Sequence, residues 1–367
     1  MKNLSLKVLI LLVICLYTSC KEQIQEEKGN LVFKKEQSVT FEKVPFFKEK
    51  NMVSLEMNDT SLIAAYPALA VHKDYDLVYS KQSGGQILQF NREGKFLTKI
   101  GNLGSGPGEY MGLTDVQINP TDGSIEVLGQ DAICQYTSSG AFLKKIPHSY
   151  PAFSFCKEDE QTYWFYLGNN NLNGNNKVYK TDQTLNKVGG YLESNPKMLP
   201  LMEQNFHKGD DYLTFHEGFN THLYRIQKHE LVETYNVSLG NLAINLQDFP
   251  SDPMQLLPYL QKKNYANIQC YLENNQYIYL LIAEHVPNQK GNSIYHWFIQ
   301  KETQKEFFIK QPEGITPDSY LYAPQVLTSE NLLYFIGYPL ESSETVSLGE
   351  TNPSIIILDL STVFGNN

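Results

Sequence analysis

The chain has 367 residues and a formal net charge of −10, and only two of its 30 basic residues are arginine. A hydrophobic fraction of 41% excludes wholesale disorder, and the length suits one large β domain or two ordinary domains. An acidic chain without clustered arginines is unsuited to a phosphate backbone, so we expect no nucleic-acid partner.

The first 19 residues predict a signal peptide. Lys2 and Lys7 precede an uncharged apolar run, 8–17, that is too short to span a bilayer but typical of a signal-peptide core. The run ends in small residues directly before Cys20 and resembles a bacterial lipobox, in which the cysteine is acylated. We therefore expect residues 1–19 to be removed and Cys20 to carry lipid; the alternative is an ordinary secretory signal with an incidental cysteine.

Residues 20–37 begin with a charged stretch and predict a flexible tether. The lysine and acids directly after Cys20 resemble the surface-export signals of Bacteroidetes lipoproteins. The expected location is the outer membrane, either at the cell surface or facing the periplasm. We expect contact with the membrane only through the N-terminal lipid.

An internal repeat dominates the rest of the chain. Residues 88–100 align without a gap onto residues 134–146, and Gln, an aromatic residue, Gly, Phe, Leu, Lys and Ile recur in register. Each copy predicts two strands joined by a turn whose glycine, Gly94 or Gly140, adopts a positive φ. Weaker copies follow at 178–188, 223–235 and 297–309. Short strands repeating every 40–50 residues are typical of β-propeller blades.

The expected fold is all-β: a six-bladed β-propeller over residues 38–367 with four-stranded antiparallel blades. The sixth unit ends at residues 355–360 without a fourth strand, so we expect the N-terminal strand at 38–44 to complete it and close the ring. An insertion at about 238–266 includes a predicted helix, Asp252–Leu257, capped by the aspartate and ended soon afterwards by Pro258.

After the first repeated hairpin, Gly104–Tyr110 reads Gly-Ser-Gly-Pro-Gly-Glu-Tyr. With the signal, the tether and the repeat, this loop resembles the six-bladed β-propeller lipoproteins of Bacteroidetes, which are related at fold level to NHL-type propellers. The resemblance implies the fold and the envelope location, and it implies no activity.

The same loop is a weak candidate for phosphate binding, because Pro107 and Gly108 lead into the acidic Glu109 rather than into a helix. We expect a tight crossover between blades. The alternative is that Glu109 and Tyr110 face a ligand at one mouth of the central channel.

Four histidines lie between His207 and His229, and two of them, His216 and His222, span a predicted hairpin turn. These two could pair across strands and are candidate ligand-binding residues. The spacing matches no zinc motif, so we expect no metal and no cofactor. Tyrosine-rich runs at 163–166, 277–279 and 320–322 predict packing between blades, with stacking on sugar rings as the alternative.

Three cysteines remain after the signal and Cys20, and their β-type neighbours predict buried small apolar residues: Cys134, Cys156 and Cys270. No catalytic motif stands out. We expect a non-catalytic binding or scaffold protein, monomeric or part of an envelope complex, whose partner is a glycan, a peptide or an envelope protein of a nutrient-uptake system. The alternative is a hydrolase or lyase, which acidic, histidine or arginine side chains converging in the channel would favour.

Overall fold

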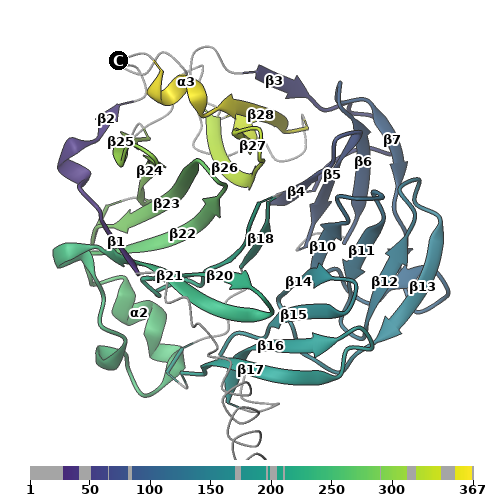
Figure 1. The fold of residues 1–367 in the computed structure, drawn as a ribbon, viewed down its shortest axis with the longest axis horizontal. Coiled ribbons are helices and arrows are strands. Elements are labelled where there is room, and N and C mark those ends of the chain that lie inside the picture. The colour runs from purple at the N-terminus through teal and green to yellow at the C-terminus, as the bar shows by residue number, and fades with distance from the viewer. Residues whose placement is uncertain are drawn as a thin grey trace, which may run out of the picture.

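The computed structural model describes residues 28–40, 51–64, 66–81, 85–169, 175–195, 197–198, 205–209, 211–289, 291–311, 320–339 and 352–365. The signal peptide and Cys20 lie outside these ranges. Within them, six sheets of four or five strands are arranged as a ring around a central channel (Figure 1). The predicted six-bladed β-propeller is therefore confirmed.

The first three blades are antiparallel and run in chain order from the channel outwards. Blade 1 consists of β4 (Pro67–Val71), β5 (Tyr75–Ser80), β6 (Ile87–Asn91) and β7 (Phe96–Lys99). Blade 2 consists of β10 (Asp115–Ile118), β11 (Ile125–Leu128), β12 (Ala132–Tyr136) and β13 (Phe142–Pro147). Blade 3 consists of β14 (Ser154–Asp159), β15 (Thr162–Tyr166), β16 (Asn176–Asp182) and β17 (Lys187–Glu193). A short parallel pair, β8 (Asn102–Leu103) and β9 (Glu109–Tyr110), joins blades 1 and 2.

The next three blades each include a strand from the N-terminal segment. Blade 4 consists of β18 (Phe206–Lys208), β19 (Leu213–Phe215), β20 (His222–Gln227), β21 (Glu230–Ser238) and the outermost β1 (Gly29–Val32). Blade 5 consists of β22 (Tyr265–Glu273), β23 (Tyr277–His285), β24 (Ser293–Gln300), β25 (Lys305–Lys310) and the outermost β2 (Val39–Thr40). Blade 6 consists of β26 (Tyr320–Leu327), β27 (Leu332–Pro339), β28 (Ser354–Asp359) and the outermost β3 (Asn51–Ser54).

The ring is closed by an N-terminal strand, but not by the segment that the sequence predicts. β3 pairs antiparallel with β28, from Ser354 opposite Ser54 to Ile357 opposite Asn51. The segment at 38–44 contributes β2, which instead pairs in parallel with β25 of blade 5. The assignment of 38–44 as the closing strand is therefore wrong.

The predicted tether, residues 20–37, also ends earlier than expected. Residues 29–32 form β1, which pairs in parallel with β21, and residues 35–37 form the 3₁₀ turn η1 (Lys35–Gln37). Three lysines fasten this segment to the blades: Lys28 to Glu233 at 2.8 Å, Lys34 to Glu306 at 3.4 Å and Lys35 to Glu284 at 2.6 Å. Residues 29–37 thus belong to the propeller, because the N-terminal segment covers the outer edges of blades 4 and 5.

The two repeated hairpins have the same local structure, as predicted. Gly94 and Gly140 adopt φ values of 82° and 85°, where an L side chain would be strained. Both hairpins also contain a register shift at the same aligned position, between Gln89 and Phe90 in blade 1 and between Gln135 and Tyr136 in blade 2.

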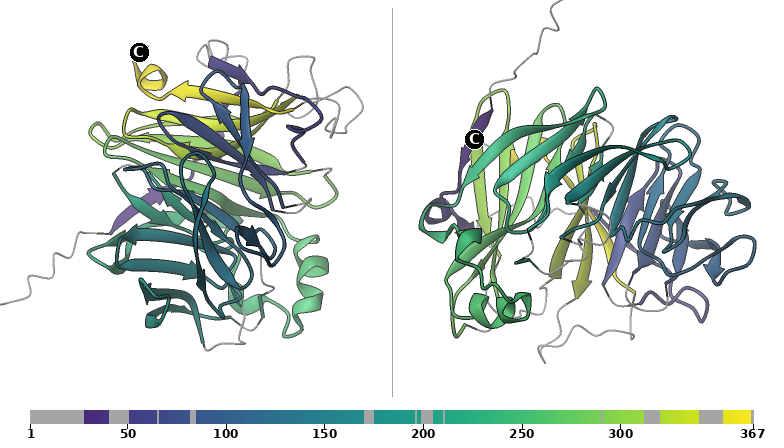
Figure 2. Two further views of the ribbon diagram at one scale, coloured as in Figure 1. Left: turned by 90° about the vertical axis from the view of Figure 1, so that its right-hand side faces the viewer. Right: turned by 90° about the horizontal axis from the view of Figure 1, so that it is seen from below.

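The insertion carries four short helical elements among its described residues, on one face of the ring (Figure 2). They are η5 (Gly240–Leu242), η6 (Leu246–Asp248), η7 (Pro253–Gln255) and α2 (Leu256–Leu260), and a further turn, α3 (Ser361–Phe364), follows β28. The Asp252 side chain accepts a hydrogen bond from the Met254 amide at 3.0 Å, which confirms the predicted cap. The helix continues through Pro258 to Leu260, contrary to expectation.

Aromatic side chains fill the space between neighbouring blades. Every residue of 163–166 and of 277–279 is buried, so these runs pack the core and cannot stack on a sugar ring. The side chains of Tyr320 and Tyr322 lie outside the described part of the structure. The three cysteines are buried, as predicted, and all three are free.

Candidate binding site

The innermost strands of the six blades surround the channel, which is narrow. Its waist holds a cavity of about 60 Å³, roughly the room of a few water molecules. The apolar part of the lining comes from β4, β10, β18, β22 and β26, and includes Leu69, Val71, Val116, Phe206, Leu272, Val326 and Leu327. Six polar or charged side chains complete the lining: Gln117, His207, Lys208, Thr214, Glu273 and Gln325.

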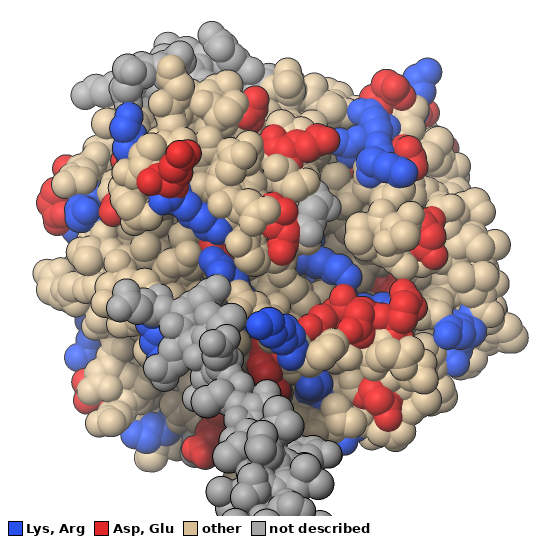
Figure 3. All heavy atoms as spheres, in the orientation of Figure 1, with Lys and Arg blue, Asp and Glu red and all other residues tan. Residues whose placement is uncertain are grey.

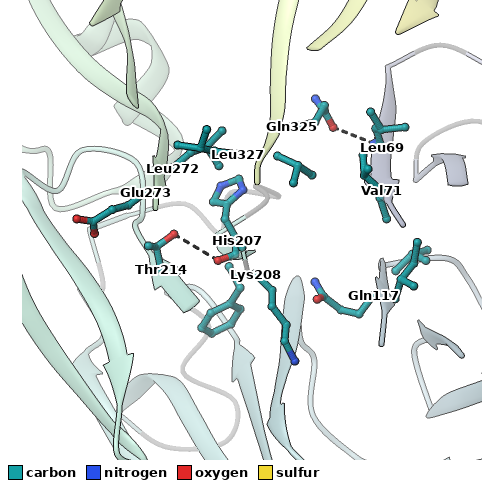
Figure 4. Close-up of a pocket in the computed structure, with 16 residues that line it drawn as sticks. Leu69, Val71, Gln117, His207, Lys208, Thr214, Leu272, Glu273, Gln325 and Leu327 are labelled. Atoms are coloured by element: carbon teal, nitrogen blue, oxygen red, sulfur yellow. Dashed lines mark hydrogen bonds between the residues drawn. The ribbon is translucent and has the colours of Figure 1, made fainter. Parts of the chain in front are cut away.

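The polar groups of the waist mainly join one blade to the next (Figure 4). The Gln325 carbonyl oxygen of blade 6 accepts a hydrogen bond from the Leu69 amide of blade 1 at 2.9 Å. The Thr214 hydroxyl donates to the carbonyl oxygens of His207 and Tyr271, at 3.4 and 3.3 Å. The His207 ring lies in the channel and stacks on His216, with 5.6 Å between ring centroids. These contacts stabilise the closed ring of blades.

The carboxylates near the waist are occupied by fixed partners. Glu273 points away from the channel in Figure 4, and its oxygens receive hydrogen bonds from Arg225 at 2.5 and 2.7 Å and an ion pair from Lys301 at 2.6 Å. These cations hold the pKa of Glu273 below its usual value, although burial opposes them. Asp115 is fully buried and accepts from the Phe155 amide of blade 3 at 3.2 Å, with Lys81 at 3.3 Å.

Among the described residues, therefore, no two carboxylates converge on the channel as an acid–base pair would require. No group of three or more His, Cys, Asp or Glu side chains in the described ranges is arranged to hold a metal ion.

The channel widens at one mouth, on the face opposite the insertion. The inner strands all end on this face, because they run in the same direction and β22 starts beside α2. A cavity of about 530 Å³ opens here, within the usual size range of small-molecule sites. Figure 3 shows basic and acidic side chains gathered around the centre of the ring on this face.

Basic residues from two blades line this cavity: Lys73 after β4 and Arg92 after β6 in blade 1, and Lys208 at the end of β18 in blade 4. Glu330 is the one carboxylate in the described lining, and Tyr334 and Leu332 form part of the wall. The guanidinium of Arg92 is held by the buried Asp76 and donates to the Tyr334 hydroxyl at 2.7 Å. Burial raises the pKa of Asp76, and the neighbouring Arg92 opposes that rise.

A second cavity of about 370 Å³ lies on the other side of Lys208. Its charged side chains are Glu126 of blade 2, Lys208 of blade 4 and four residues of blade 3: Lys157, Glu158, Asp159 and Glu160. The charged side chains of this lining have partners within the protein. Lys157 pairs with Glu160 at 2.8 Å, and Glu158 accepts hydrogen bonds from the Trp164 indole at 2.9 Å and the His229 amide at 3.0 Å.

The predicted ligand residues of the glycine-rich loop lie elsewhere. Tyr110 is fully buried against blades 1 and 2, and its hydroxyl donates to the Gly85 carbonyl at 2.9 Å. Glu109 accepts a hydrogen bond from the Gly106 amide at 2.8 Å, which folds the loop onto itself. Neither residue lines a mouth cavity. The structure thus gives both residues structural contacts in the blade crossover.

The predicted pair His216 and His222 is not brought together. His216 follows β19 and is buried against His207, and burial lowers its pKa to about 4. His222 opens β20, is half-exposed, and contacts Glu233 at 2.8 Å beside Lys28. The register pairs Phe215 with Tyr224, so His216 and His222 are not directly opposite each other in the sheet.

The mouth residues Lys73, Arg92 and Lys208 were missed from the sequence. Lys73 and Lys208 stand at or just after the C-terminal ends of inner strands, where a propeller presents side chains to its channel mouth. The position at the end of an inner strand could have identified these lysines as mouth residues. However, β18 has only three residues and was not recognised as a strand.

Fold and site together define an all-β, six-bladed propeller with a constricted channel and one charged mouth. The chain belongs to the family described as domain of unknown function DUF4934, whose model matches residues 25–359. No curated protein matches it. In addition, no helix among the described residues has the length and apolar character needed to cross a membrane.

Two solved structures share the fold at low sequence identity. One, from Bacteroides fragilis, is of a protein described as exported; it is 14% identical, with a TM-score of 0.69, covering 90% of this chain and 99% of that one. The other, from Bacteroides vulgatus, belongs to the DUF4221 family and is 12% identical, with a TM-score of 0.52, covering 84% of this chain and 95% of that one. At this identity the likeness establishes the fold alone.

Proposed function

We propose that the protein is a lipid-anchored envelope protein that binds an extracytoplasmic partner at the charged mouth of its propeller without catalysis. The observation that carries this proposal is the contrast along the channel. The waist is small and its polar groups mainly join one blade to the next, whereas the mouth offers a cavity of about 530 Å³ lined by Lys73, Arg92 and Lys208. A cavity of this kind can hold a ligand and lacks a convergent acid–base pair.

The export signal supports an extracytoplasmic location, and the Bacteroides fragilis structure, described as that of an exported protein, agrees with it. The anchor proposal has a direct test. Replacing Cys20 with Ala should release the protein from the membrane fraction into the soluble fraction, and unchanged retention would refute acylation at this residue.

The chain direction also supports a role at the membrane surface. β21 starts on the mouth face and β1 runs parallel to it, so the chain enters blade 4 from the side of the mouth (Figure 2). The nine residue-to-residue steps from Cys20 to Gly29 can span at most about 30 Å. A lipid on Cys20 would therefore keep the mouth close to the bilayer, where an envelope protein or a ligand delivered by one would meet it.

Capture of the partner from intact cells tests the binding role. The Lys73→Glu variant changes the mouth, and Lys262→Glu makes the same charge reversal in the insertion on the opposite face; both lysines are exposed. After crosslinking and affinity purification, the wild-type protein and Lys262→Glu should retain the same specific partner, and Lys73→Glu should lose most of it. Equal recovery with both variants would refute the mouth as the binding site.

A further inference from the structure

The two sides of the mouth differ in how their charges are used. On the acidic side, Lys157, Glu158 and Glu160 have partners within the blade. On the basic side, Arg92 is matched by the buried Asp76. Lys73 and Lys208 have no described carboxylate within 4.0 Å of the ammonium nitrogen, which makes them the unmatched charges of the cavity.

Lys208 is the more informative of the two because it is half-buried. Its ammonium donates to the Lys157 carbonyl at 2.6 Å, which uses one of its three N–H groups. Comparable half-buried lysines of this chain have a carboxylate partner: Lys81 faces Asp115 at 3.3 Å and Lys177 faces Glu217 at 2.5 Å. A partly desolvated ammonium without a counter-charge is stabilised by an anion that enters the site.

Figure 4 shows Lys208 and Gln117 extending into the same space from β18 and β10. The Gln117 amide adds a neutral hydrogen-bonding group beside the ammonium. The cavity that continues from Lys208 is walled by apolar side chains, including Val71, Ile118, Pro120 and Leu332. The site thus combines unmatched positive charge with an apolar wall.

We propose that this cavity binds a small organic anion, whose carboxylate or phosphate group lies between Lys73 and Lys208 and whose body packs on the apolar wall. This inference rests on the proposed function and specifies the ligand class of the same mouth. Glu330 limits the charge that the site accepts, because it is the one described carboxylate of the lining and faces the same cavity.

A matched pair of probes separates charge from shape. Phenylacetate and phenylacetamide have nearly the same size and differ in their charge, and inorganic phosphate tests the anionic group without an apolar body. Binding of each to the purified mature protein is measured by titration calorimetry in low salt. We expect phenylacetate to bind at least tenfold more tightly than phenylacetamide, and more tightly than phosphate.

Variants then locate the site. Lys73→Gln and Lys208→Gln should each weaken phenylacetate binding by about threefold to tenfold, whereas Lys262→Gln, on the opposite face, should leave it unchanged. Because Lys208→Gln removes a half-buried contact, its folding is checked by circular dichroism, and the exposed Lys73 supplies an independent variant. Glu330→Gln should strengthen binding.

Three results would overturn the proposal: equal binding of acid and amide, equal losses in Lys73→Gln and Lys262→Gln, or no binding of any anion. Failure of this inference remains distinct from failure of the proposed function. If Lys73→Glu loses the cellular partner while the probes show no preference for an anion, the mouth is the binding site and the ligand class is wrong. If the anion binds but partner capture is insensitive to the mouth, the proposed function fails instead.

Discussion

Gly94 and Gly140 occupy the same position in the internal repeat and have nearly the same φ, yet their surroundings differ. A Cβ on Gly94 would lie 2.2 Å from the Ser54 carbonyl oxygen, which belongs to the closing strand β3. A Cβ on Gly140 would meet the Ile100 Cδ1 atom at 2.8 Å, and its next neighbour is 3.8 Å away. Replacing each glycine with alanine therefore compares one local change in two tertiary contexts.

The expected loss of unfolding free energy has one contribution that both substitutions share and one that depends on the site. Alanine at a positive φ costs about 1–2 kcal/mol at either position. At Gly140 the obstacle is the end of a flexible side chain, so the total should stay near that value. At Gly94 the obstacle is backbone that also pairs with β28, and displacing it adds about 1–3 kcal/mol. We expect Gly94→Ala to lose about 2–5 kcal/mol and Gly140→Ala about 1–2 kcal/mol of the free energy of unfolding.

Equilibrium unfolding of the purified mature chain in urea measures both losses. The midpoints of wild type, Gly140→Ala and Gly94→Ala should fall in that order, with equal m-values if the transition stays cooperative. Equal destabilisation by the two substitutions would show that β3 does not pack against this turn, and would refute the assignment of 51–54 as the closing strand.

Three further predictions concern buried groups. Burial lowers the pKa of His216 and His296 from 6.5 to about 4, so the unfolded chain takes up protons that the folded chain refuses. The free energy of unfolding should therefore fall as the pH drops from about 6.5 to about 4, by at most about 3 kcal/mol per histidine, and urea midpoints that do not change with pH would contradict this. Burial raises the pKa of the thiols of Cys134, Cys156 and Cys270, so in a chain with Cys20→Ser a thiol reagent should label none of them before unfolding and all three afterwards; rapid labelling of the native protein would contradict it. Tyr110→Phe removes the hydrogen bond to the Gly85 carbonyl and should cost about 1–3 kcal/mol in urea without affecting partner capture, whereas lost capture at unchanged stability would give Tyr110 a ligand role.

Features that depend only on neighbouring residues can be read from the amino-acid sequence. The repeat at 88–100 and 134–146 identified the hairpins, because strand periodicity and a glycine at positive φ are local requirements. Asp252 was recognised as a helix cap for the same reason. Since all six blades are built from such local units, their number and antiparallel order followed as well.

The tertiary structure decided which distant segments meet. Strands of two to four residues carry too little pattern to specify a partner, so the pairing of β1, β2 and β3 with blades 4, 5 and 6 depends on which outer edges the closed ring leaves open. The mouth of the channel is likewise formed by segments that are distant in sequence. Lys73 and Lys208 line the same cavity because their inner strands end on one face. No local spacing encodes that arrangement, and it is also why Gly94 and Gly140, alike in the repeat, face different neighbours.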